Sequence, residues 1–317
     1  MNNVVRSKIK PSRGNKLGKT IRKDFKKNKE LYLLALPVLA FYFIFHYKPM
    51  YGAMIAFKDF IPIKGIVGSP WVGFKHFQDF FGSYFFLRVI KNTLTISVTS
   101  IVLGFPAPII LALLINELRK KAFSRIVQTI TYLPHFISLV VICGLIKEFT
   151  SDTGLISTIL GVFTGRAENL LNFPKYFVPI FVGSDIWQGV GYGSIIYLAA
   201  LSGIDQELYE AASIDGSGKF GQLINITIPG ILPTIIIMLI LRIGGVLNVG
   251  FEKIILLYNP AIYSTSDVIS SLVYRKGLQE FDYSFSSAVG LFNSAINCLF
   301  LFSANWLSRK FNDTSLW

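Results

Sequence analysis

Long apolar runs constrain this chain more than any other feature of its sequence. An α-helix needs about 20 apolar residues to cross roughly 30 Å of hydrocarbon. Because a backbone in lipid satisfies its hydrogen bonds only within a helix or a closed barrel, runs approaching that length predict helices. We therefore expect an all-α integral membrane protein with six transmembrane helices. The six runs lie near residues 31–47, 89–116, 126–146, 176–201, 230–249 and 285–307.

The composition agrees with a membrane protein. Of the 317 residues, 52% are hydrophobic and 15% are charged, and the mean hydropathy is +0.53. Soluble globular domains usually carry about 25% charged residues. The composition therefore excludes an ordinary soluble domain.

Basic residues indicate the orientation. The formal net charge is +13, and residues 1–29 hold eleven Lys or Arg and a single acid. Further basic clusters lie at 117–125 and 308–311. Because cytoplasmic loops are enriched in Lys and Arg, we expect these segments and both termini to be cytoplasmic. In that position the basic residues attract anionic membrane lipids, and we predict no nucleic-acid partner.

The same topology places three segments outside the cell: 48–88, 147–175 and 250–284. The first is rich in aromatic residues and turn formers, which predicts a folded cap. We expect two regions in all, a basic cytoplasmic tail over residues 1–29 and one transmembrane domain over residues 30–317.

The sequence shows no pattern of metal ligands or disulfides. Cys143 and Cys298 both lie inside apolar runs, where a thiol behaves as a small hydrophobe. His46, His76 and His135 are scattered along the chain. We therefore predict no metal site and no cofactor bound by this chain.

Two short sequences copy known ligand motifs. "GNKLGKT" (14–20) ends like a phosphate-binding loop, but it is one residue short and lies in the polar tail. "VGYG" (190–193) copies a potassium-channel filter, but it lacks the usual threonine before the valine and lies inside the run 176–201. We interpret its glycines as sites of close helix packing. A potassium-selective channel is the alternative.

A polar stretch interrupts the apolar runs between residues 202 and 229 and is cytoplasmic by the same topology. Asp205 can cap a short helix, and Gly216 stands where a left-handed residue would end it. Pro229 and Pro233 follow, and we expect them to limit continuation of regular helix. The pattern predicts a rigid elbow that faces a cytosolic partner, with an ordinary solvated loop as the alternative.

The order of residues in this stretch resembles the EAA loop of permease subunits in bacterial binding-protein-dependent ABC importers. The matching residues are Glu210-Ala211-Ala212, Asp215-Gly216, Phe220, and Ile226 to Pro229. Similar matches occur at "YKPMYGAMIAFKDF" (47–60), "SPWVGFKHF" (69–77), "WQGVGYGSIIYLAALSGID" (187–205) and "LNVGFEKIILLYNPAIYSTSDVI" (247–269). Together they resemble LplB-type permeases of polysaccharide and oligosaccharide importers, over nearly the whole chain from about residue 30.

The resemblance implies a type I ABC importer permease fold in the bacterial cell membrane, with the elbow as a coupling helix. Glu210 would form an ion pair or a hydrogen bond with the ATPase. Ala211 and Ala212 would allow close packing against the ATPase surface, and Gly216 would make the turn. The implied partners are a second permease subunit, two ATPase subunits that bind ATP and Mg, and an extracellular solute-binding protein. Ser217 and Ile228 depart from the usual alanine and leucine by small volumes.

Polar and aromatic residues inside the runs are candidates for the substrate path, because sugars bind to polar groups and aromatic faces. For each of them an interhelical hydrogen bond or an interfacial aromatic is the alternative. Arg242 lies deep in the fifth run and marks a cavity or a subunit interface, with snorkelling to the surface as the weaker alternative. The candidates are Trp187, Gln188, Tyr192, Tyr197, Arg242, Asn248, Asn293 and Asn297.

We therefore expect a non-catalytic permease subunit that translocates a carbohydrate by alternating access. An importer of another solute, such as a glycerophosphodiester or an amino acid, is the alternative within transport. A membrane scaffold with a lipid-binding tail is the alternative outside transport.

Overall fold

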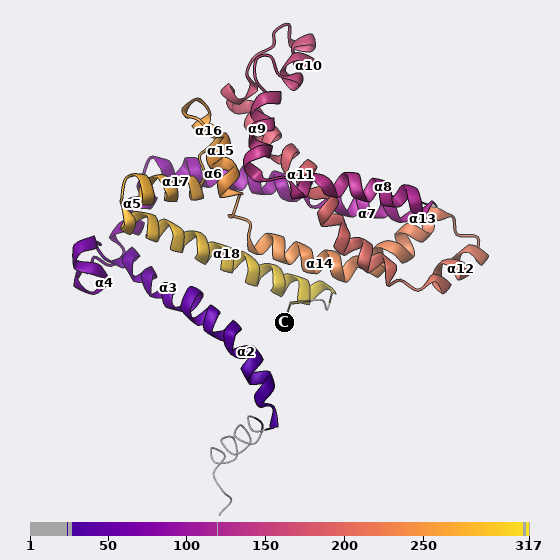
Figure 1. The fold of residues 1–317 in the computed structure, drawn as a ribbon, viewed down its shortest axis with the longest axis horizontal. Helices are drawn as coiled ribbons and strands as arrows, with labels where there is room; N and C mark the ends of the chain where they lie inside the picture. Colours follow the sequence, from indigo (N-terminus) through magenta and orange to yellow (C-terminus); the bar gives the residue numbers. More distant parts are fainter. Residues whose placement is uncertain (1–23, 25–26, 119, 313–314, 317) are drawn as a thin grey trace, which may run out of the picture. The chain divides into compact units, whose positions relative to one another are not determined.

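The computed structural model describes residues 24, 27–118, 120–312 and 315–316, and these form helices without a β-strand (Figure 1). The all-α expectation is therefore confirmed for the described residues. The chain divides into two compact units, residues 1–54 and 55–317. The motif at 14–20 lies outside the described residues, as does the predicted tail 1–29 apart from residues 24 and 27–29.

The first unit contains the N-terminal helix. Its segments are α2 (Lys29–Tyr42), the π-helical η1 (Phe43–Tyr47), α3 (Lys48–Met50) and the start of η2 (Tyr51–Phe57), which together make an apolar helix over Lys29–Phe57. None of the α2 side chains is buried by protein. The length and apolar composition of the helix over Lys29–Phe57 suit a bilayer.

Four helical runs in the described residues are long and apolar enough to cross a bilayer, and they coincide with the first, second, fifth and sixth predicted runs. The first is Lys29–Phe57. The second joins α6 (Phe85–Thr99), the π-helical η4 (Ser100–Gly104) and α7 (Pro106–Asn116). The other two are α13 (Lys219–Gln222), η7 (Leu223–Thr227) and α14 (Ile228–Gly244) in series, and α18 (Tyr283–Asn312).

The third predicted run, 126–146, is not one uninterrupted helix. It forms α8 (Lys121–Tyr132), the 3-10 turn η5 (Leu133–Phe136) and α9 (Leu139–Phe149), with a bend of 97° between the two parts. Pro134 lacks the N–H that a continuing helix needs. Ser138 then adopts an extended backbone and its hydroxyl accepts a hydrogen bond from the N–H of Val141, which starts α9. If the bent pair is counted as one span, the described residues hold five candidates.

The fourth predicted run forms α11 (Pro174–Ser202), the 29-residue helix that contacts α7, α8, α14 and α16. At about 1.5 Å per residue it is long enough to span a bilayer. It is less apolar than the four spans because it carries Asp185, Gln188 and several glycines. By length and composition the described residues therefore hold four or five candidate spans, so the predicted count of six is not confirmed.

The prolines after the elbow do not end the fifth helix, which corrects our expectation. The helix over Lys219–Gly244 runs past both of them. Pro229 occupies the first turn of α14, directly after the π-helical η7, and Pro233 lies inside α14. The π-helical turn of η7 directly before Pro229 changes the hydrogen-bond pattern at the point where a regular α-helix would need the missing N–H.

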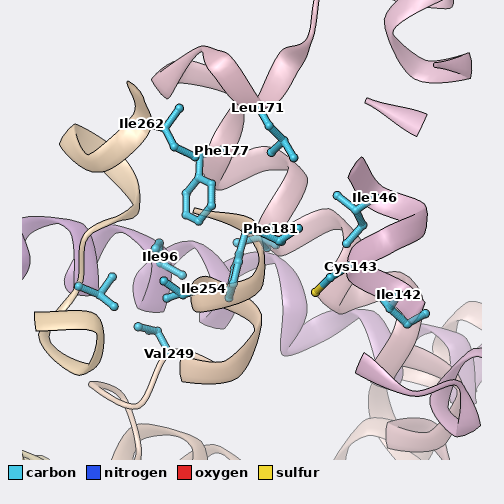
Figure 2. Packing of buried hydrophobic residues seen from close by; sticks show 13 residues of the cluster. Ile96, Ile142, Cys143, Ile146, Leu171, Phe177, Phe181, Val249, Ile254 and Ile262 are labelled. Carbon is cyan, nitrogen blue, oxygen red and sulfur yellow. The ribbon is translucent and has the colours of Figure 1, made fainter. Parts of the chain in front are cut away.

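The core lies between α6, α9, α11 and the segment after α14. Figure 2 shows Phe181 of α11 between Ile254 of α15 (Phe251–Leu257) and Cys143 of α9. Phe181 and Ile254 are almost completely buried. A second contact joins α14 to α18, which lie side by side in Figure 1. These contacts hold the middle of α11 against the end of α14.

The three predicted external segments are built from short helices. Residues 48–88 contain η3 (Pro62–Lys64), α4 (Gly65–Gly68) and α5 (Lys75–Phe81), and residues 147–175 contain α10 (Leu155–Thr164) and η6 (Leu170–Asn172). Residues 250–284 contain α15, η8 (Pro260–Ile262), α16 (Tyr263–Ser266), α17 (Ile269–Tyr274) and η9 (Arg275–Gln279).

The folded cap expected over 48–88 has a buried lysine at its centre. The Lys58 ammonium donates hydrogen bonds to the carbonyls of Ile66 at 2.7 Å, Val67 at 3.2 Å and Ser69 at 3.3 Å. An isolated antiparallel bridge joins Lys58 to Trp71. These contacts close residues 58–71 into a folded loop.

Candidate functional site

The VGYG sequence lies in the middle of α11, with its backbone in helical conformation. Gly191 is buried, and a Cβ placed on it would lie 2.0 Å from the carbonyl oxygen of Thr131 in α8. The interpretation as a close-packing site therefore holds at Gly191. A potassium filter needs backbone carbonyls that are free to face an ion, and those of a helix are engaged in the helix.

The polar stretch forms α12 (Gln206–Ile214), with both ends as the sequence predicts. The Asp205 carboxylate accepts a hydrogen bond from the N–H of Glu207 at 3.0 Å. Gly216 has φ 78°, and the N–H of Ser217 donates to the Ala212 carbonyl at 2.8 Å. This is a Schellman end, which favours glycine at the left-handed position.

One side of α12 is attached to the helix that follows it. The Tyr209 and Thr227 hydroxyls are 3.0 Å apart, and the Gln222 amide donates to the Ser213 hydroxyl at 2.8 Å. The sequence did not reveal these contacts, because they join residues on different helices. Of the six predicted coupling residues, Ala212 is half-buried, while Glu210, Ala211, Asp215, Gly216 and Phe220 are exposed.

An ion pair ties the same region to the second span. The Lys219 ammonium, in the first turn of α13, pairs with the Glu117 carboxylate just after α7. Both side chains are more than half exposed, so the pair adds little stability, about 0–1 kcal/mol. A groove of about 520 Å³ lies beside it and is lined in part by Phe220.

Two adjoining cavities lie among the spans and share three residues: Ser100, Asp185 and Arg242. Their volumes are about 260 and 180 Å³. We call the pair the Arg242 cavity. Ser100 begins the π-helical η4, a distortion often found at functional sites. The larger part is also lined by Gly104, Phe105, Pro108, Gly189, Gly193, Tyr197 and Met238, and the smaller by Ile96, Ser97, Phe181, Asn248, Val249 and Gly250.

A buried lysine holds the acidic group of the Arg242 cavity. The Lys253 ammonium lies 2.6 Å from the Asp185 carboxylate and donates to the Phe181 carbonyl at 3.0 Å. The side chain of Lys253 is 3% exposed and that of Asp185 is 40% exposed. Our sequence interpretation missed both residues. An acid in the middle of an apolar run was the available signal, because such groups usually face a cavity.

Arg242 lines both parts of the cavity, which agrees with the interpretation that it marks one. Its guanidinium forms no ion pair or hydrogen bond with any other residue that the structure describes. It is also exposed in this single chain. Of the side chains that line the cavity, those of Asp185 and Arg242 are charged.

The three candidate asparagines form one hydrogen-bonded cluster. The Asn248 side-chain oxygen accepts from Asn293 at 3.0 Å and from Asn297 at 3.2 Å. The Asn297 side-chain oxygen accepts from the N–H of Leu247 at 3.0 Å. These bonds join α18 to the segment after α14, so they have the structural role that we kept as the alternative, although Asn248 itself lies outside a helix. Asn248 also lines the Arg242 cavity, while Asn293 lines a separate one.

The aromatic and amide candidates of α11 lie apart. Trp187 lines an apolar cavity of about 480 Å³ beside α9 and α10. Tyr192 is exposed and stacks on His135, with the ring centroids 3.9 Å apart. Tyr197 is buried and lines the Arg242 cavity, whereas Gln188 is half-buried and lines neither part of it. Three of the eight candidates, Tyr197, Arg242 and Asn248, therefore share this cavity.

A second charged cluster stabilises the segment 250–284. The buried Asp267 carboxylate pairs with Arg88 of α6 at 2.8 Å and with Arg275 of η9 at 3.0 Å, and it accepts from the Ser271 hydroxyl at 2.8 Å. Burial lowers the pKa of Arg275, but the hydrogen bond and charge of Asp267 outweigh it and raise that pKa overall. The carboxylate is paired with both guanidinium groups, although Arg88 Nε and Arg275 Nη1 form no hydrogen bond, and the cluster lines neither part of the Arg242 cavity.

Comparison with known proteins gives consistent results. Residues 104–313 match the family described as binding-protein-dependent transport system inner membrane component. The chain is 44% identical to protein LplB of Bacillus subtilis (strain 168) over 92% of each chain. It is 40% identical to the polygalacturonan/rhamnogalacturonan transport system permease protein YteP of the same organism, over 91% of this chain and 90% of that one.

A solved structure resembles the fold as well. It is a chain from the crystal structure of a bacterial alginate ABC transporter in complex with an alginate pentasaccharide-bound periplasmic protein. The TM-score is 0.86 at 44% identity, over 93% of this chain and 99% of that chain. The matched region of the family includes α12 and all three parts of the helix that carries Arg242. The chain therefore belongs to the family of inner membrane components of binding-protein-dependent transport systems.

Proposed function

We propose that this chain is the permease subunit of an ATP-driven importer that moves an oligosaccharide or polysaccharide across the membrane by alternating access. The observation that carries the proposal is the likeness along more than nine-tenths of the chain to permeases whose names include polysaccharides. The polar Arg242 cavity between the spans gives such a substrate a place to pass.

The proposed topology has six spans. The bent pair α8–α9 makes one of them, and α11 makes another whose acidic residue, Asp185, faces the cavity instead of lipid. An even number of spans places both termini on the same side, and their basic residues favour the cytoplasm. The membrane is the bacterial cell membrane.

The proposed complex contains a second permease subunit, two ATPase subunits and an extracellular solute-binding protein. ATP and Mg bind to the ATPase subunits, and this chain performs no catalysis. The family description and the periplasmic protein in the similar alginate structure support the binding protein. Purification from the native membrane in mild detergent tests the assembly. We expect a second permease and an ATPase to co-purify, whereas a homotetramer without ATPase activity would contradict the proposal.

The proposed coupling helix is α12. Its exposed residues Glu210 and Ala211 are free to contact an ATPase, and the bonds of Tyr209 and Gln222 transmit its position to the following helix. Alanine at 211 permits close approach of the partner surface. The charge of Glu210 fixes the position of α12 on the surface of the ATPase.

Replacing Gly216 by proline should lower transport and substrate-stimulated ATPase activity about tenfold or more. Proline holds φ near −65°, whereas Gly216 has φ 78°, and its N–H donates to the Ser213 carbonyl at 3.2 Å. Glu210→Ala should have a smaller effect, at most about tenfold, because it removes one charged hydrogen bond. Both activities are measured on the complete importer in proteoliposomes.

Gly218→Ala is the matched control for the glycine variant. Gly218 has φ −72°, and a Cβ there meets no atom within 4 Å, so we expect normal transport. All variants should insert into the membrane at the level of the unmodified chain. Unchanged transport in both Gly216→Pro and Glu210→Ala would refute the coupling role of α12.

A further inference from the structure

The helix that follows α12 has a weak point near its start. In η7 the N–H of Ile228 donates to the Leu223 carbonyl, five positions back, where a regular α-helix would bond four positions back. Pro229 comes next and has no N–H to donate. Sharp bends in helices occur mostly at π-helical turns and at prolines. The stretch 223–229 is therefore where a movement of α12 would be lost before it reached the rest of α14.

Two hydrogen bonds join α12 to both ends of η7. The Tyr209 hydroxyl lies 3.0 Å from that of Thr227, the last residue of η7. The Gln222 amide, directly before η7, donates to the Ser213 hydroxyl at 2.8 Å. Tyr209 and Ser213 are four positions apart, so they share one face of α12. We call these two bonds together the α12–η7 contact.

Thr227 connects this contact to the backbone of the π-helical turn. Its hydroxyl donates to the Gln222 carbonyl at 3.3 Å, across the length of the turn. A hydroxyl has a single hydrogen, so Tyr209 is the donor in its bond with Thr227. The chain of hydrogen bonds thus runs from α12 through one side chain into the turn. Thr227 is buried, so little water is present to replace a lost bond.

We infer that Tyr209 and Thr227 are positioning residues for coupling. Their hydroxyl pair holds η7 in one geometry, so that α12 and the start of α14 move as one body. This inference rests on the proposed function, because it takes α12 as the helix that contacts the ATPase. The two residues act through η7, whereas the exposed Glu210 and Ala211 are the groups that would meet the ATPase.

Hydrogen exchange of the backbone amides over residues 223–228 measures whether the contact holds η7. It is recorded on the complete importer in detergent, where the exchange rate reports the free energy of local opening. Tyr209→Phe and Thr227→Val each remove one hydroxyl with little change in shape. We expect each to raise exchange by about twofold to tenfold, the value of one neutral hydrogen bond. Thr227→Ser keeps the hydroxyl and should exchange near the unmodified rate.

The double variant tests whether the two hydroxyls act through one bond. If they do, Tyr209→Phe combined with Thr227→Val should raise exchange by about the same factor as Thr227→Val alone. Thr158→Val is the matched control, because the Thr158 hydroxyl donates to the Gly154 carbonyl at the start of α10, its own helix. That variant should leave exchange over residues 223–228 unchanged.

The positioning role is measured as the ratio of ATPase activity with and without the binding protein, with an alginate pentasaccharide as the added probe. A merely structural defect lowers both activities together, because fewer complexes assemble, and leaves their ratio unchanged. Loss of positioning keeps the basal activity and lowers the stimulated one. We expect the ratio to fall by about twofold to tenfold in Tyr209→Phe and Thr227→Val. It should stay at the unmodified value in Thr227→Ser and Thr158→Val.

Any of four results would overturn this inference and leave the proposed function standing. They are unchanged exchange over residues 223–228 in both Tyr209→Phe and Thr227→Val, an unchanged ATPase ratio in both, a loss in Thr227→Ser equal to that in Thr227→Val, and a double variant whose loss is the product of the single losses. An unmodified complex without an ATPase, or with one that does not respond to the binding protein, would instead refute the proposed function itself.

Discussion

Asp267→Ala should destabilise the protein by about 3–5 kcal/mol, the cost of leaving buried charges without their partner. The carboxylate is fully buried and pairs with Arg88 and Arg275, whose side chains are 24% and 16% exposed. Removing it leaves two guanidinium groups facing one another with little water. The Asn92 amide, which donates to the Asp267 backbone carbonyl at 2.9 Å, does not supply the missing charge.

The measurement for Asp267 is the fraction of detergent-solubilised importer that still elutes as the intact complex after heating. Asp152→Ala is the control, because Asp152 is exposed and should change stability by less than about 0.5 kcal/mol. Replacing Asp267, Arg88 and Arg275 together by apolar residues should recover part of the loss. Equal heat resistance in Asp267→Ala and the unmodified importer would show that this cluster does not hold the segment 250–284.

Gly191→Ala should destabilise the helix pair α8–α11 by about 3 kcal/mol, the upper end of the usual cost of overpacking. The added Cβ would lie 2.0 Å from the Thr131 carbonyl oxygen and 2.3 Å from its carbon. Both atoms belong to the backbone, so no side-chain rotation relieves the clash and the helices must separate. Exchange of glycine for alanine inside a helix would otherwise stabilise it by about 0.5–1 kcal/mol.

Gly183→Ala, in the same helix, is the control variant for Gly191→Ala. A Cβ at Gly183 meets no atom within 4 Å, so there we expect unchanged or slightly higher heat resistance. The two variants have identical chemistry and differ only in their surroundings. If both behave alike in the elution measurement, the close contact between α8 and α11 is absent in the assembled importer.

Local rules were sufficient where a structure depends on neighbouring residues. Asp205 and Gly216 mark the ends of α12 because capping and left-handed backbone are properties of single positions. Apolar length likewise located the spans over Phe85–Asn116 and Tyr283–Lys310. Resemblance to a known family, and not the pattern itself, supplied the coupling role of α12.

Sequence rules that use neighbouring residues failed where interacting residues are far apart in the sequence, and where a helix break lies inside an apolar run. Asp185 and Lys253 are 68 positions apart, and no sequence pattern says that they pair. The bend in the third run depends on Pro134 and on the extended backbone at Ser138, inside a stretch that is apolar throughout. Conversely, Pro229 and Pro233 had the signature of a break, yet the π-helical η7 lets the helix continue through them.

That continuous helix over Lys219–Gly244 connects the residues next to α12 with the Arg242 cavity. Its 26 residues span about 39 Å. One end begins directly after α12 and is bonded to it, and the other carries Arg242 into the cavity. A tilt imposed at α12 would therefore be passed along this helix, through the π-helical η7 and past Pro233, towards Arg242. If α12 binds an ATPase as we propose, this helix joins the coupling contact to the cavity that Arg242 lines.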